Sequence, residues 1–106
     1  MKATFPEPIL RLPEADLPFP GVKAYLSQSD DHQIIFMQFA QDVEALEHVH
    51  AGQYAVVLAG RIDMVIGGQA FSFSRGDTYC IPAGTPHSAR IHAGYADMTF
   101  FDEPSR

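Results

Sequence analysis

Hydrophobic and polar positions along this chain alternate in short runs that are separated by turn-forming residues. Residues 33–40 are the strongest run, because they are rich in the β-branched and aromatic residues that favour strands. Gly67-Gly68 is typical of a tight hairpin, since both glycines can adopt a positive φ. No segment shows a sustained helical period. The pattern predicts strands at residues 22–27, 33–40, 53–58, 61–66, 69–73, 78–82, 88–92 and 97–101, and an acidic connection at residues 42–47.

Many short strands separated by frequent turns predict an all-β sandwich or small antiparallel β-barrel. The length of 106 residues favours one domain with a single modest core. Residues 1–20 contain five prolines, which exclude a long helix or a central strand there. We therefore expect an extended N-terminal arm at residues 1–20, laid across the body or a partner subunit, and a barrel domain at residues 21–106.

Two of the predicted strands contain segments, at residues 34–37 and 54–58, that are apolar on both faces. A strand of a closed barrel has one inner and one outer face, so an apolar outer face needs a cover. The sequence therefore predicts a homodimer.

Composition and charge exclude several classes of partner. The hydrophobic content of 46% and the charged content of 19% are those of an ordinary globular protein. A formal net charge of −6 opposes binding to nucleic acid or to an anionic membrane. The chain shows neither a bilayer-spanning apolar run nor the apolar region of a secretory signal, and its single cysteine allows no internal disulfide. A cytoplasmic protein is expected.

Candidate metal ligands occur in two stretches. His48 and His50 stand two residues apart, so on a strand they would face the same way, and Gln53 follows them. Neutral imidazoles held side by side suit divalent transition metals. The second stretch runs from Gly76 to His87 and includes Pro82-Ala83-Gly84.

Together these stretches resemble the two sequence motifs of the cupin superfamily. In the first motif, His48-Val49-His50 is present, and Gln53 stands seven residues before Gly60, where the family has an acidic ligand. In the second, Gly76, Pro82, Gly84 and His87 are in place. The resemblance implies a six-to-eight-stranded antiparallel jelly roll (a double-stranded β-helix). It also implies one divalent transition metal (Zn, Ni, Mn, Fe or Cu), held by His48, His50, Gln53 and His87. Four neutral ligands would leave the full dipositive charge on the metal, which favours Lewis-acid chemistry over oxygenation.

The glutamine variant of the motif is similar to the KdgF-type cupins, small single-domain proteins of carbohydrate metabolism that linearise unsaturated uronates. That resemblance implies a small acidic sugar as the substrate, Asp97 as the acid/base group and Arg106 as the partner of the substrate carboxylate. It also implies an aromatic residue in the substrate pocket, for which Phe101 is the candidate. Tyr79 is a further candidate for the pocket from its place in the strand at residues 78–82. In this chain the aspartate and the phenylalanine of the carboxy-terminal strand are out of register with the family's pattern.

Other interpretations of the same residues remain open. The chain is alternatively a cupin dioxygenase or decarboxylase, or a non-catalytic binding or sensor cupin. The histidines are alternatively ordinary surface or core residues, Gln53 a hydrogen-bonding neighbour of the metal ligands, and Arg106 a solvated tail. Tyr79 is as well placed to face outward as inward, and Cys80 is expected to be a buried, inert thiol.

Overall fold

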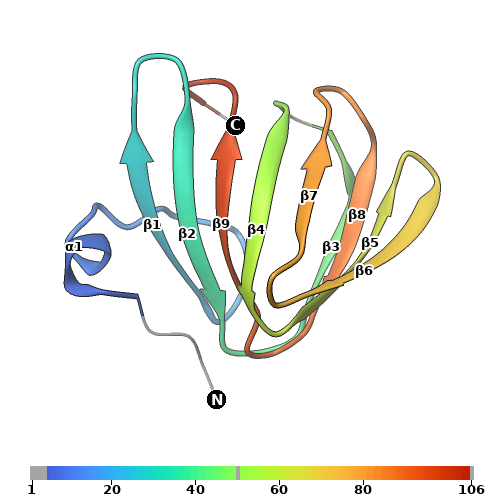
Figure 1. Cartoon of the computed structure of the whole chain (residues 1–106), viewed down its shortest axis with the longest axis horizontal. Helices are drawn as coiled ribbons and strands as arrows, with labels where there is room; N and C mark the ends of the chain where they lie inside the picture. Colours follow the sequence, from blue (N-terminus) through green and yellow to red (C-terminus); the bar gives the residue numbers. More distant parts are fainter. Residues whose placement is uncertain (1–4, 50, 106) are drawn as a thin grey trace.

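The computed structural model describes residues 5–49 and 51–105, and these form two antiparallel sheets that face each other (Figure 1). Sheet A has the order β1-β2-β9-β4-β7, and sheet B has the order β3-β8-β5-β6. The described strands are β1 (Val22–Gln28), β2 (Gln33–Phe39), β3 (Val43–His48), β4 (Gln53–Ala59), β5 (Arg61–Ile66), β6 (Gln69–Ser74), β7 (Thr78–Ile81), β8 (His87–Ile91) and β9 (Ala96–Phe101). The prediction of an all-β jelly roll is confirmed.

Strand β3 corrects one prediction, because the expected acidic connection at residues 42–47 is a strand. Val43 and Ala45 are buried, whereas Glu44 and Glu47 are exposed, so the acidic residues occupy the solvent face of an edge strand. The acidic residues made the segment look like a connection, although its buried and exposed positions alternate as in a strand. The remaining strands lie within two residues of their predicted bounds.

The N-terminal arm follows the edge of sheet A and contains one helical turn, α1 (Glu7–Leu10), which the sequence analysis did not predict (Figure 1). Pro8 is tolerated there because the first turn of a helix leaves its N–H groups without helical partners. Glu14 then forms an isolated bridge with Tyr25 of β1. Phe5 packs edge-on against Tyr25 and Phe36, at ring-centroid distances of 6.1 and 5.9 Å. The arm thus covers part of the outer face of sheet A. None of the described helices is long and apolar enough to cross a membrane.

The core lies between the sheets and is arranged in layers that follow the strand register. On sheet B, His48 and His87 form one layer, Ala45, Met64 and Ala89 the next, and Val43, Ile62 and Ile91 the third. On sheet A, the inward residues of β9 run from Asp97 through Thr99 to Phe101, and Phe101 is level with Gln53 of β4. Figure 1 shows that β4 begins, and β3 and β9 end, at the same end of the molecule. The histidine layer and Gln53 therefore share that end.

The turn between β4 and β5 requires glycine at position 60. Gly60 has a φ of +74°, and a Cβ there would lie 2.6 Å from the Cα atom of Tyr95. Replacing Gly60 with alanine is expected to lower the free energy of unfolding by about 3 kcal/mol, because left-handed strain adds to a backbone clash. Gly68 provides the control, since it has a φ of +84° but a Cβ added there would meet no atom within 4 Å. The Gly68→Ala variant should lose about 1 kcal/mol. Equal losses in urea denaturation of the two variants would contradict the role of the clash.

Candidate metal centre

A β-bulge brings the first candidate ligands together. Ala45 pairs with Ala89, but His48 pairs with His87, so β3 advances by three residues while β8 advances by two. Without the extra residue, His48 would have the opposite orientation to the buried Ala45. With it, the rings of His48 and His87 lie at a centroid distance of 4.3 Å. Both side chains line the same cavity.

Backbone carbonyls orient both imidazole rings. His48 Nδ1 lies 2.6 Å from the carbonyl oxygen of Leu46, and His87 Nδ1 lies 2.9 Å from that of Thr85. A carbonyl oxygen only accepts hydrogen bonds, so each Nδ1 carries the proton. Each Nε2 therefore keeps its lone pair, which is the tautomer that a metal-binding histidine needs.

Gln53 supplies a third candidate donor from the opposite sheet. Its Oε1 is buried and has no hydrogen-bond partner among the described residues. A buried amide oxygen without a partner is costly, so such an atom indicates a position that suits a cation or a hydrogen-bond donor. The donor set of two imidazole nitrogens and one amide oxygen fits a divalent transition metal.

Two predicted residues lie outside the described residues: His50, a predicted metal ligand, and Arg106, the predicted partner of a substrate carboxylate. Among residues 5–49 and 51–105, no group of three His, Cys, Asp or Glu side chains is arranged to hold a metal ion. The four-ligand site therefore stays a prediction, in which His48, His87 and Gln53 are placed and His50 is not.

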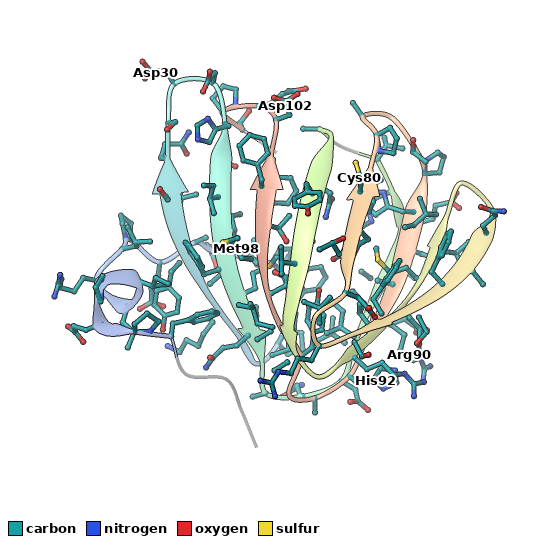
Figure 2. All side chains as sticks on the ribbon, in the orientation of Figure 1. Asp30, Cys80, Arg90, His92, Met98 and Asp102 are labelled. Atoms are coloured by element: carbon teal, nitrogen blue, oxygen red, sulfur yellow. The ribbon has the colours of Figure 1, made fainter. Side chains whose placement is uncertain are left out.

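The candidate ligands open onto a cavity of about 900 Å³, which is within the usual range for small-molecule sites. Tyr79 and Phe101, both predicted pocket residues, line it and are buried. Tyr79 faces inward together with Ile81, so Cys80 between them faces outward and is exposed (Figure 2). The expectation that Cys80 is buried was wrong, because one strand cannot turn consecutive side chains to the same face.

Asp97 also lines the cavity and belongs to a buried hydrogen-bond network. Its Oδ2 accepts a hydrogen bond from the Tyr95 hydroxyl, and its Oδ1 accepts one from Thr99 Oγ1 at 3.1 Å. Because Tyr95 donates its proton to Asp97, the Tyr79 hydroxyl, 3.2 Å away, is the donor to Tyr95. Tyr95 was not among the residues predicted from the sequence, although Tyr95, Asp97, Thr99 and Phe101 alternate along one face.

Burial dominates the electrostatics of this network. Asp97 is only 1% exposed, and burial raises its pKa to about 7 in spite of the opposing effect of the hydrogen bonds from Tyr95 and Thr99. Burial, followed by the charge of Asp97, also raises the pKa of Tyr79 and of Tyr95 above the usual tyrosine value. Near neutral pH the two tyrosines therefore keep their protons, whereas Asp97 is divided between its protonated and ionised forms.

The strand register separates Asp97 from the candidate metal ligands. Gln53 is level with Phe101, and Asp97 lies four residues earlier on β9, about 13 Å along the strand. Both carboxylate oxygens of Asp97 are already occupied as acceptors. Its role as acid/base group stays a prediction, and this geometry assigns Tyr95 and Tyr79 as the side chains through which it would exchange a proton.

Comparison with known proteins identifies the family. A family model described as "Cupin domain" matches residues 35–102, which is more than half of the chain. The chain belongs to the cupin family. No curated protein sequence matches this cupin.

Solved structures show the same fold at low sequence identity. KdgF from Halomonas sp. is 21% identical, with 89% of each chain covered and a TM-score of 0.73. An RmlC-like cupin from Shewanella frigidimarina is 20% identical, with 92% of this chain and 87% of that chain covered and a TM-score of 0.77. Oxalate decarboxylase from Bacillus subtilis, which has Mn(II) centres, is 21% identical over 88% of this cupin and 28% of that chain, with a TM-score of 0.71. These likenesses establish the fold, and cupins with metal centres are among the neighbours.

Proposed function

We propose that this cupin binds one divalent transition metal through His48, His50, Gln53 and His87 and uses it on a small molecule held in the cavity. One observation carries the proposal. Gln53 Oε1 is buried and has no hydrogen-bond partner in the described part of the chain. Gln53 lines the same cavity as His48 and His87, and the Nδ1 atom of each imidazole is hydrogen-bonded to a carbonyl oxygen. When bound, the metal would act as a Lewis acid of undiminished charge, because all four ligands are neutral. Zn, Ni, Mn, Fe and Cu all suit such a donor set.

The chain's own residues supply orientation, shelter and a proton source. The carbonyl groups of Leu46 and Thr85 hold the imidazole rings in place. The apolar side chains of the cavity wall would displace part of the water around a bound molecule, which would strengthen electrostatic interactions there. At neutral pH, Asp97 is balanced between its two protonation states, so the Asp97–Tyr95–Tyr79 chain is able to accept or return a proton.

Elemental analysis and calorimetric titration test the metal. We expect one divalent ion per chain in protein loaded with Zn²⁺, Ni²⁺ or Mn²⁺. A stoichiometry of zero with every metal would overturn the proposed function.

The substrate predicted from the KdgF resemblance is an unsaturated uronate, opened and ketonised by the metal-loaded protein. The structure of KdgF from Halomonas sp. shares the fold, and Arg106 would bind the substrate carboxylate. The resemblance predicts that the ultraviolet absorbance of a 4,5-unsaturated uronate falls when the loaded protein is added, and that the fall requires the metal. Unchanged absorbance with fully loaded protein would reject this substrate while leaving the metal site standing.

A second candidate function is favoured by the oxalate decarboxylase neighbours, which share the fold with a TM-score above 0.7. Release of carbon dioxide or consumption of oxygen with a candidate acid would support a decarboxylase or dioxygenase. Stabilisation by a ligand without turnover would support a non-catalytic binding or sensor cupin. The cytoplasmic location stays a prediction.

We also propose that the outer face of sheet A forms a homodimer. Tyr54, Leu58, Met98 and Phe100 are exposed there on the neighbouring strands β4 and β9, and Figure 2 labels Met98. None of these four side chains is charged, so two copies of a chain with a net charge of −6 can meet there without placing like charges in contact.

Sedimentation equilibrium at micromolar concentration is expected to show a dimer, and the Met98→Glu variant a monomer, because a buried unpaired charge is costly. The matched control is Val65→Glu on β5, where the side chain is similarly exposed on the other sheet. A monomeric wild-type protein, or equal effects of the two variants, would contradict the proposed interface.

A further inference from the structure

The body of the cavity, below its metal end, is shaped by small and apolar side chains. Ala89 of β8 pairs with Ala45 of β3 on one side and with Met64 of β5 on the other, directly beneath the histidine layer. All three side chains line the cavity. Ala45 and Ala89 present only methyl groups at positions where larger side chains would fit, so an open volume remains between the sheets.

The wall and the mouth of the cavity are apolar as well. Leu17, Pro18 and Phe19 of the N-terminal arm line the wall, and Phe19 packs on Phe39 at a ring-centroid distance of 6.3 Å. Leu46 and Val49, on either side of His48 in sequence, line the same cavity while 80% and 56% exposed. Exposed apolar residues at a cavity mouth indicate an apolar ligand.

The described lining of the cavity body, away from the candidate metal ligands, opposes a charged or heavily hydroxylated ligand body. The lining includes the buried acidic residue Asp97, and among the described residues it includes neither lysine nor arginine. Asp97 and the two tyrosine hydroxyls bond to one another. A sugar acid would therefore exchange its hydrogen bonds to water for contacts with methyl and methylene groups. The described lining thus argues against the unsaturated uronate that the KdgF resemblance implies.

We propose that the ligand of this cavity is a small molecule with an apolar body, aromatic or aliphatic, and a single enolic or phenolic oxygen as its headgroup. This inference rests on the proposed metal site. A metal with four neutral protein ligands keeps a dipositive charge, which favours an anionic oxygen donor at that end. The body occupies the layer of Ala45 and Ala89 and contacts Phe19 of the arm.

Calorimetric titration of the Zn²⁺-loaded protein with two probes of similar size, 4-tert-butylphenol and glucuronate, tests the inference. We expect the phenol to bind at least ten times more tightly. The Ala89→Leu variant, which fills the alanine layer, should lose at least tenfold in affinity for the phenol and keep one Zn²⁺ per chain. Ala70→Leu on β6, where the alanine is exposed, is the matched control and should leave phenol binding unchanged.

Glucuronate binding as tight as that of the phenol, or unchanged phenol binding in Ala89→Leu, would overturn the inference. If Ala89→Leu does not fold, the ranking of the two probes on the wild-type protein decides alone. If the protein binds no Zn²⁺, the proposed metal-binding function is wrong, and this outcome is distinct from failure of the ligand inference. In that case, titration of the metal-free protein with the same probes still reads out whether the cavity accepts the apolar body.

Discussion

Replacing His87 with alanine is expected to lower the affinity for Zn²⁺ by at least about 100-fold, because even the partners that orient metal ligands contribute 10- to 100-fold. His87 is buried, and its Nε2 would be the metal-binding nitrogen because Nδ1 donates to the carbonyl oxygen of Thr85. Competition against a chromophoric chelator measures the change. The matched control is His92→Ala, which removes a histidine that bonds Asp63 at 2.7 Å on the same sheet. Wild-type affinity in His87→Ala would contradict the site.

A second variant separates metal binding from folding. Gln53→Met removes a buried oxygen that lacks a partner in the described structure, so the metal-free protein should gain about 1 kcal/mol or more in its free energy of unfolding. The same variant should bind Zn²⁺ more weakly than the wild-type protein. A gain in stability together with a loss of Zn²⁺ affinity is expected only if the amide oxygen is a metal ligand. A loss of stability in Gln53→Met would indicate a structural role.

Replacing Asp97 with asparagine is expected to remove a pH dependence of stability between about pH 4 and pH 7. Burial raises the pKa of Asp97 from 3.8 to about 7, so within this range the folded protein binds a proton that the unfolded chain has released. This contribution to stability is fully present below pH 4 and is lost as the pH rises to 7. A shift of this size corresponds to about 4 kcal/mol.

Urea denaturation of the metal-free protein at pH 4.5, 6 and 8 measures the effect as the difference between wild type and Asp97→Asn. Tyr95, Tyr79 and Thr99 are the polar groups bonded within this network, and the pKa of each tyrosine is raised, so neither titrates in this range. The pKa of Asp63 is lowered by its bonds to Arg61, His92 and Ser72, so its own contribution changes only at lower pH. Asp102→Asn, at an exposed aspartate, is the control. Parallel curves for the wild type and Asp97→Asn would contradict the raised pKa.

The fold could largely be predicted from local sequence, but one strand and one helical turn could not. Glu44 and Glu47 made residues 42–47 look like a connection, although Val43 and Ala45 alternate with them as in any edge strand. Helix α1 forms among prolines because a single turn tolerates Pro8 near its start. In both cases the acidic or proline-rich composition of the segment argued against a regular element, although the positions of individual residues allowed one.

The candidate site could be predicted in its residue types and less in its arrangement. Tyr79 and Phe101 line the cavity together with His48, His87 and Gln53, whose roles there stay predictions. Asp97 could be proposed for proton transfer from the sequence, but Tyr95, whose hydroxyl donates a hydrogen bond to it, could not. A tyrosine two residues before an aspartate carries no signal until both are known to face the same interior.

The sequence by itself determined the short strands, the glycine turn at positions 67 and 68, and the supply of imidazole and amide donors, because these depend on neighbouring residues. Only the tertiary structure decided that His48 faces inward, since the bulge that turns it depends on the pairing of β3 with β8. It also decided the pKa of Asp97, which reflects burial by distant strands, and the cavity, which exists because Ala45 and Ala89 meet across two strands. These properties arise from contacts between residues that are far apart along the chain.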